Sequence, residues 1–365
     1  MTRAIVIPTW RGHFEANLRF LRSYAARAQY PQRIPVRFVV SNPAEAAELR
    51  ARFAAEPALG VVNIEIHAIP DILQRHGVDP SQAQAFRVEN FENKYSYQSI
   101  KKLYGVLDSA ADQVLVLDSE AYLWTPTDLD ELFDRYFAAP FVFVSSTDNE
   151  FLRLVNRSSL LLVDPALGRP DLLHRWVFEY PAWFFEKKTL AEFIAEIARQ
   201  HGRPVFEVLS RSSNVFEVIG YYWFIYLHRE AYPAYRFWEV APLLEEALGP
   251  APAADFLALF RGRPHGILEH YLFGLTESNF ENLSALIQRL GLHFVRIESF
   301  HAGGNMALVR RFIRHNPTIR VFACSDSLSA FISPPNAVTA LLLRLARFGR
   351  RAVRFTLRKT GLSPA

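Results

Sequence analysis

Apolar residues in the first third of the chain follow two alternating patterns. Short apolar runs at residues 4–7, 36–40 and 61–69 predict buried strands, because their length is typical of strands and polar turns flank them. Between these runs, residues 14–28 and 43–55 have the spacing or composition of helices. Alternating strands and helices favour right-handed crossovers and a mostly parallel sheet. We therefore expect an α/β fold with a Rossmann-type sheet flanked by helices.

The rest of the chain extends this pattern with smaller elements. The stretch at residues 89–106 contains a helix, with Gln98, Lys101 and Lys102 on it, that leads into a strand at residues 114–117. Another helix is expected to begin at Pro126, with Thr125 as its cap. Further strands are expected at residues 141–144, 160–163, 292–297 and 319–323, and an amphipathic helix at residues 190–199.

An aromatic-rich second half and a proline-containing linker suggest the organisation of the chain. We expect one continuous domain with two halves, residues 1–125 and 126–332, followed by a separate tail at residues 333–365. The chain has 365 residues, of which 50% are hydrophobic, so it can bury a large core. Its single cysteine fits a reducing compartment and excludes an internal disulfide framework. No apolar run approaches the length of a membrane span, so we expect a soluble, cytoplasmic protein.

Basic residues are concentrated near the C-terminus. The net charge is +4, but residues 341–360 contain seven Lys and Arg and no acid, so the rest of the chain is slightly acidic. This distribution argues against a nucleic-acid-binding core. Residues 337–359 are predicted to form a two-faced basic helix that lies on the inner face of an anionic membrane. Docking of this helix on the body of the protein or on a partner is the alternative.

Two carboxylates mark the end of the strand at residues 114–117. Asp118 and Glu120 follow four apolar residues, so they are expected at the carboxyl edge of the sheet, where open α/β folds bind ligands. Carboxylate oxygens suit Mg²⁺ or Mn²⁺, which usually complete their coordination with substrate phosphates. The alternative is a strand end whose acids only bind the following turn.

Three further groups are candidates for chemistry. Lys94, Gln98 and Lys101 or Lys102 lie along one side of the helix before the acidic strand, where cations could meet a diphosphate, although a solvent-exposed lysine face has the same pattern. His301 beside two glycines suits a metal ligand or a plain turn. Glu217, within an apolar helix, either pairs with a cation or faces a cavity as a general base.

The sequence resembles the GT-A fold of nucleotide-sugar glycosyltransferases over roughly residues 4–305. The resemblance rests on the opening Ile-Val-Ile-Pro-Thr, on the Gln-x-x-Lys helix, on Asp118-Ser119-Glu120 in place of an Asp-x-Asp motif, and on the 216–221 stretch, which resembles bacterial surface-polysaccharide proteins. The first half would then bind the nucleotide-sugar and the second half would face the acceptor. Glu120 departs from the usual second Asp of the motif.

The resemblance implies roles for individual residues. Asp118, Glu120 and His301 would hold Mn²⁺ or Mg²⁺, and Glu217 would activate the acceptor hydroxyl. The nucleotide-sugar would contact Pro8, Thr9, Arg11, Lys94, Gln98, Lys101, Asp118 and Ser119.

These roles imply a metal-assisted glycosyltransferase that acts on a glycan or lipid-linked acceptor. It inverts configuration if Glu217 is a base and retains it if Glu217 is a nucleophile, with Asp148 or Glu150 as fallback bases. Two other functions stay open, a sugar nucleotidyltransferase and a non-catalytic carbohydrate-binding or membrane-tethered protein. There is neither a Gly-x-Gly-x-x-Gly fingerprint after the first strand nor a Walker-type lysine loop.

Overall fold

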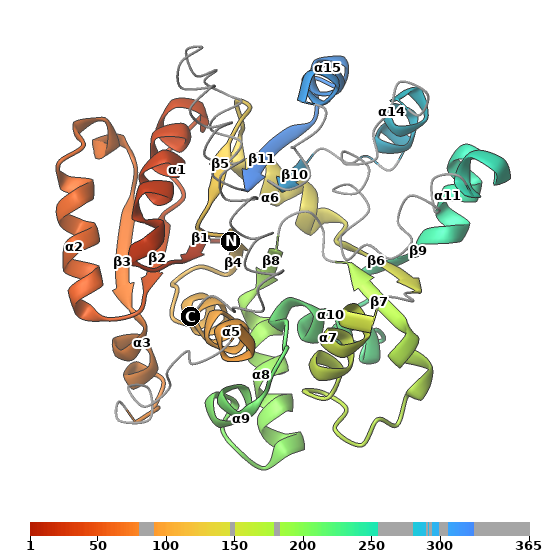
Figure 1. The fold of residues 1–365 in the computed structure, drawn as a ribbon, viewed down its shortest axis with the longest axis horizontal. Coiled ribbons are helices and arrows are strands. Elements are labelled where there is room, and N and C mark those ends of the chain that lie inside the picture. The colour runs from red at the N-terminus through yellow and green to blue at the C-terminus, as the bar shows by residue number, and fades with distance from the viewer. Residues whose placement is uncertain are drawn as a thin grey trace, which may run out of the picture.

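A five-stranded sheet forms the centre of the protein (Figure 1). The computed structural model describes residues 1–79, 91–146, 150–178, 183–254, 280–289, 291, 294–298 and 306–324. The strand order is β3 (Ile64–Ala68), β2 (Val36–Val40), β1 (Arg3–Pro8), β4 (Gln113–Val116) and β8 (Trp183–Glu186). The first four strands are parallel to one another and β8 is antiparallel to β4. The predicted α/β fold with a mostly parallel sheet is confirmed.

Helices cover both faces of this sheet. Successive strand residues point to opposite sides, so the apolar residues of each strand need cover on both faces. Ile5 and Ile7 face one cluster, which includes α1 (Phe14–Arg27), α2 (Pro43–Ala54) and α6 (Leu129–Ala138). Ala4 and Val6 face the other cluster. Its helices are α3 (Ile69–Arg75), α5 (Phe91–Leu107), α8 (Lys187–His201), α9 (Val205–Arg211) and α10 (Glu217–Leu227).

Two smaller sheets extend the central one. One has the order β10 (Phe294–Glu298), β11 (Arg320–Cys324), β5 (Ala121–Leu123), and the other β7 (Arg175–Phe178), β6 (Phe141–Ser146), β9 (Arg236–Glu239). The remaining helices are α7 (Glu150–Leu160), α11 (Val240–Leu248), α14 (Phe280–Arg289), α15 (Met306–His315), η1 (Arg11–His13), η2 (Pro57–Val61) and η3 (Pro170–His174). β11 pairs with β5, so residues late in the chain share a sheet with the segment that follows β4. None of the helices in the described ranges is long and apolar enough to cross a membrane.

Two sequence-based assignments are wrong in detail. The apolar run at residues 160–163, expected to be a strand, is the end of α7 and the turn that follows it. The helix expected to begin at Pro126 begins at Leu129, where the Asp128 side chain accepts a hydrogen bond from the Glu131 N–H. Short apolar runs do not distinguish a strand from a buried helix end, and Asp is as good a cap as Thr.

Helix α5 packs directly against the central sheet at Gly105. A Cβ atom at this position would lie 2.8 Å from Val39 Cγ2 and 3.0 Å from Val6 Cγ1, so a glycine is needed for this approach. The close packing fixes the side chains of the preceding turn of α5 relative to the ends of β1 and β2. It therefore determines where Lys101 and Lys102 lie.

Candidate functional site

The acidic residues lie in a turn at the carboxyl end of β4. The Leu117 N–H donates to the Val6 carbonyl, which extends the pairing of β1 and β4 up to this turn, and the Ala121 N–H then donates to the Asp118 carbonyl. Asp118 and Glu120 are partly exposed, whereas Ser119 between them is buried. The prediction that these acids follow a buried parallel strand is confirmed.

The loop after β1 reaches the acidic turn through His13. His13 Nδ1 lies 2.5 Å from Ser119 Oγ and 3.2 Å from Glu120 Oε1. Ser119 Oγ in turn donates to Glu120 Oε2 at 2.9 Å. An imidazole, a hydroxyl and a carboxylate from two strand ends therefore meet at the same edge of the sheet.

Asn17 of α1 forms hydrogen bonds to both the β1 loop and the acidic turn. Its Nδ2 donates to the Ser119 carbonyl at 2.8 Å, and its Oδ1 accepts from Thr9 Oγ1 at 2.6 Å. Both Asn17 and Thr9 are buried. A buried amide must satisfy its donor and acceptor within the protein, so these two hydrogen bonds define one geometry for the turn and the loop.

Lys101 of α5 joins the ends of β1 and β2. Its Nζ donates to the Thr9 carbonyl at 2.7 Å and to Ser41 Oγ at 2.9 Å, and it lies 4.7 Å from the centroid of the Tyr97 ring. The residue is only 3% exposed. Burial lowers the pKa of the Lys101 amine to about 7, although the charge of Glu45 acts in the opposite direction.

The rest of the β1 loop is fixed by acids of α2. Glu45 accepts hydrogen bonds from the Arg11 and Ser41 N–H groups, and the Arg11 guanidinium lies 2.7 Å from Glu48. The Arg11 side chain is 61% exposed. Trp10, which is 50% exposed, covers Gly12 so closely that a Cβ on Gly12 would lie 2.4 Å from Trp10 Cη2.

Glu217 is the first residue of α10. Its carboxylate contacts α5 on a different side from Lys101. Its Oε1 is 2.9 Å from Lys102 Nζ and its Oε2 accepts from Ser99 Oγ at 2.6 Å. The sequence placed it within a helix, but the left-handed backbone of Asn214 (φ 55) and the extended Phe216 delay the helix start to Glu217. Of the two alternatives for this acid, pairing with a cation is the one observed.

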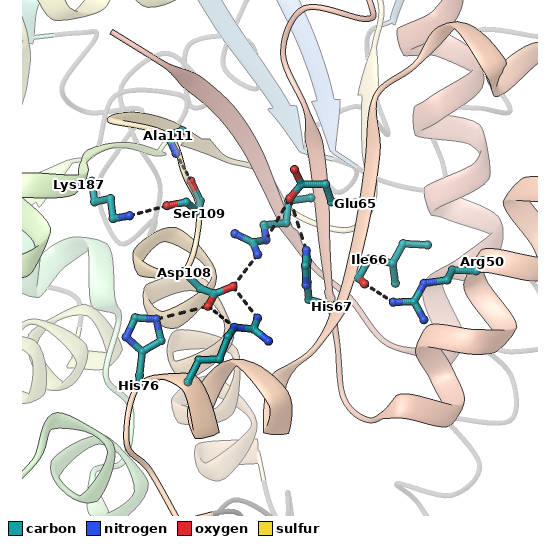
Figure 2. Close-up of polar contacts among 11 residues, drawn as sticks. Arg50, Glu65, Ile66, His67, His76, Asp108, Ser109, Ala111 and Lys187 are labelled. Atoms are coloured by element: carbon teal, nitrogen blue, oxygen red, sulfur yellow. Dashed lines mark hydrogen bonds and ion pairs between the residues drawn. The ribbon is translucent and has the colours of Figure 1, made fainter.

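A second polar cluster lies at the opposite edge of the sheet, around Asp108 (Figure 2). Asp108 follows α5 and precedes β4, and its carboxylate contacts Arg37, Arg75 and His76 at 2.6, 2.7 and 3.6 Å. Burial alone would raise the pKa of Asp108, but the hydrogen bond from Arg75 and the charges of both arginines lower it below its usual value. Glu65 lies 3.5 Å from Arg37 Nε and extends the cluster onto β3.

The fold is similar to several solved structures, each at low sequence identity. One is mouse xyloside xylosyltransferase 1, which is 10% identical, with 73% of this chain and 96% of that chain covered and a TM-score of 0.36. Another is core-mannan synthase A from Aspergillus fumigatus, 10% identical over 60% of this chain and 66% of that chain, with a TM-score of 0.34. Glucosyl-3-phosphoglycerate synthase from Mycobacterium tuberculosis is 14% identical over 80% of each chain, with a TM-score of 0.33.

No protein-family model matches the sequence, and no curated protein matches it. The similarities to solved structures are distant in sequence. The function proposed below therefore rests on the residues of this chain.

The donor atoms of the acidic turn can be compared with the needs of a divalent ion. Asp118 and Glu120 offer carboxylate oxygens at a partly exposed edge, which suits Mg²⁺ or Mn²⁺. Among the described residues, no three His, Cys, Asp or Glu side chains are grouped so that they alone could hold a metal ion. His301, the predicted third ligand, lies outside the described residues. Two carboxylates fit an ion that completes its shell with phosphate oxygens.

The predicted nucleotide-sugar ligands divide into three groups. Thr9, Ser119 and Lys101 are buried and belong to the hydrogen-bonded support of the edge, as does Pro8 at the buried end of β1. Arg11, Asp118 and Gln98 are exposed or partly exposed. Lys94 lies on α5, but the structure does not describe its side chain.

His13, Asn17, Ser41 and Glu45 belong to the same site but were not predicted from the sequence. His13 follows the first strand, so its position after a strand end was the one available signal. Asn17 lies on the buried face of an amphipathic helix, where an amide without a partner is unfavourable. A polar residue on an apolar helix face is therefore the pattern that could have identified it.

Proposed function

We propose that this protein is a metal-assisted glycosyltransferase that moves a sugar from a nucleotide-sugar donor to a glycan or lipid-linked acceptor. The observation that supports this most is the meeting of the acidic turn and the β1 loop at the carboxyl edge of the sheet, where His13 lies 3.2 Å from Glu120. In open α/β sheets this edge is where ligands bind. The resemblance of the sequence to GT-A proteins adds to the proposal.

The proposed chemistry is a displacement at the anomeric carbon of the donor sugar. The acceptor hydroxyl oxygen forms a bond to this carbon while the bond from the carbon to the diphosphate oxygen breaks. The electron pair leaves with the nucleoside diphosphate, and the hydroxyl proton passes to a base. A bound Mn²⁺ or Mg²⁺ would neutralise charge on the leaving diphosphate. Asp118 and Glu120 are the residues that would hold it.

In this proposal, exposed residues of the β1 loop contact the donor. The Trp10 ring is half exposed and its centroid lies 5.2 Å from that of His13, which contacts the acidic turn. The Arg11 guanidinium is exposed on the same loop, beside Glu48 of α2. A guanidinium binds phosphate oxygens and an indole stacks on planar or sugar rings, so both suit a nucleotide-sugar. In this proposal Gln98 contributes a neutral polar contact from α5.

Glu217 stays our predicted base, and its ion pair sets a condition on that role. The carboxylate is 2% exposed and contacts Lys102, so it must separate from Lys102 before it can reach an acceptor hydroxyl. Inversion of configuration follows from a single displacement of this kind. Asp148 and the Glu150 side chain, the fallback bases, lie outside the described residues.

The acceptor and the cellular location belong to the same proposal. A lipid-linked or polymeric acceptor in bacterial surface-polysaccharide synthesis would place the reaction at the inner face of the membrane. The basic segment 337–359, outside the described residues, would bind the anionic surface there.

The test is calorimetry of UDP-sugars and GDP-sugars with and without Mn²⁺. We expect one donor class to bind, and Mn²⁺ to strengthen its binding at least tenfold. Asp118→Asn and Glu120→Gln should each remove the strengthening by Mn²⁺. Asp112→Asn is the matched control, because Asp112 lies just before the opposite end of β4 and binds Thr2.

Two results would overturn the proposal. Absence of binding to any nucleotide-sugar, with or without Mn²⁺, would indicate a non-catalytic binding protein. Release of pyrophosphate from a nucleoside triphosphate and a sugar phosphate would indicate a nucleotidyltransferase.

A further inference from the structure

The two neighbouring lysines of α5 are buried in different ways. Lys102 contacts the carboxylate of Glu217, so its charge has a direct counterion. Within the described part of the chain, the hydrogen-bond acceptors of Lys101 are neutral, namely the Thr9 carbonyl and the Ser41 hydroxyl. An anion bound nearby stabilises the ammonium form of a buried amine more when no carboxylate already contacts that amine.

Lys101 is connected to the acidic turn by hydrogen bonds that pass through Thr9 and Asn17. Its Nζ donates to the Thr9 carbonyl, Thr9 Oγ1 donates to Asn17, and Asn17 donates to the Ser119 carbonyl. All four residues are buried. Buried groups have few other hydrogen-bond partners, so a change at Lys101 should shift the segment that carries Asp118 and Glu120.

We propose that Lys101 and Asn17 are positioning residues, which fix the acidic turn relative to the β1 loop, and that an anionic ligand at this edge draws a proton onto Lys101. The proposal rests on the proposed function for its ligand, a nucleoside diphosphate. Lys101 then acts on the ligand indirectly, through Thr9 and Asn17, and does not contact the phosphate.

Burial and the charge of Glu45 set the protonation of Lys101, while the charged groups described farther along α5 and at its end are paired elsewhere. Glu45 of α2 favours the ammonium form, while burial disfavours it and the balance brings the pKa to about 7. On another side of α5, Lys102 and Glu217 pair with each other. At the far end of α5, Asp108 is paired with Arg37 and Arg75.

The linkage follows from this balance. At pH 8 the Lys101 amine of the free protein is mostly neutral, because its pKa is about 7. A diphosphate bound at the edge favours the ammonium form, so binding is accompanied by uptake of close to one proton. At pH 6 the amine is already protonated, and Lys101 contributes little uptake.

The experiment measures binding of UDP, GDP and inorganic pyrophosphate by calorimetry in buffers of different ionisation enthalpy. The wild-type protein should take up close to one proton more than Lys101→Met at pH 8, and no more at pH 6. The affinity of Lys101→Met should be at least tenfold weaker. Lys102→Met is the matched control, because it removes a buried lysine from the same helix and should leave proton uptake unchanged.

Asn17 is tested by the same titration with a second matched pair. Asn17→Leu should weaken anion binding at least tenfold. Asn156→Leu removes another buried asparagine, which binds the Leu172 carbonyl and Trp223 Nε1 away from this edge, and should keep wild-type affinity. Melting temperatures of both variants show whether a loss of affinity goes beyond a loss of stability.

The outcomes separate this proposal from the proposed function. Binding of pyrophosphate with proton uptake but of no nucleotide would support the positioning role and overturn sugar transfer. Nucleotide binding with equal uptake in the wild type and Lys101→Met would overturn the positioning proposal alone. Absence of binding to all three anions would overturn both.

Discussion

Lys102 Nζ lies 2.9 Å from Glu217 Oε1 and 3.7 Å from the centroid of the Trp183 ring. The carboxylate and the ammonium are both almost fully buried, and Ser99 adds a hydrogen bond to the other carboxylate oxygen. A buried ion pair of this kind contributes little net stability, but removing one partner leaves the other charge without compensation. The contact therefore joins α5 to α10 in one specific arrangement.

Glu217→Gln should accordingly destabilise the protein by about 3 kcal/mol, since Lys102 would keep a buried charge without a carboxylate. Thermal and urea denaturation measure this loss. Lys102→Met, which removes the other partner, should lower stability comparably, and its turnover should follow the folded fraction. Folded Glu217→Gln should instead lose turnover, because an amide cannot take the acceptor proton. Turnover kept in fully folded Glu217→Gln would contradict the proposed catalytic base and leave only the structural role of the ion pair.

A second prediction concerns the pH dependence of stability. The pKa of Lys101 is about 7 in the folded protein and 10.5 in an unperturbed lysine, so the unfolded chain holds more protons between these pH values. Stability of the wild type should therefore rise with pH relative to Lys101→Met, by up to about 1.4 kcal/mol per pH unit. Urea denaturation at several pH values measures the difference. Below pH 6 the difference should be flat, and a flat difference from pH 7 to 10 would contradict the assigned burial.

The main sheet and the position of the acidic turn follow from local patterns. The strands are short apolar runs that are buried on both faces, and Asp118 directly follows the last apolar residue of such a run. Both features depend on neighbouring residues, so they are visible in the sequence. The run at residues 160–163 failed as a strand because a buried helix end has the same composition.

The support of the site depends on contacts between distant residues. Lys101 acts on Thr9, 92 positions earlier, and Asn17 acts on Ser119, 102 positions later. A lysine pair in a helix is usually a solvent-exposed face, so the pattern of Lys101 and Lys102 indicates exposure, whereas both are buried. Only the packing of α5 on the sheet turns them inward, towards two different partners.

A third prediction concerns the cluster around Asp108. Asp108→Asn removes the carboxylate shared by Arg37 and Arg75, and should destabilise the protein by about 3 kcal/mol at pH 7. Because the pKa of Asp108 is lowered in the folded state, its contribution is present above the ordinary carboxyl pKa and is lost as the pH falls through the folded value.

Acid denaturation tests this sign. The stability difference between wild type and Asp108→Asn should shrink from about pH 4 downward, because the unfolded chain takes up the proton first and the folded carboxylate does so only at lower pH. Nucleotide binding by the folded variant should not change, since Asp108 precedes β4 and the acidic turn follows it, at the opposite edge of the sheet. A difference that stays constant down to pH 2 would contradict the prediction.

The last prediction concerns the distance between α5 and the sheet. Gly105→Ala places a methyl group 2.8 Å from Val39 Cγ2 and 3.0 Å from Val6 Cγ1, inside a packed core. Alanine favours a helix by about 1 kcal/mol over glycine, but overpacking costs about 1–3 kcal/mol and the valines are stiff, so a net loss of about 1 kcal/mol is expected. Gly60→Ala, where nothing lies within 4 Å of the added atom, is the control and should change stability little.

The same substitution should also affect anion binding. Because α5 must move outward to relieve the contact, the hydrogen bond from Lys101 to the Thr9 carbonyl should weaken. Anion affinity should therefore fall in Gly105→Ala but not in Gly60→Ala. Unchanged affinity in a destabilised Gly105→Ala would show that the helix position and the site are independent.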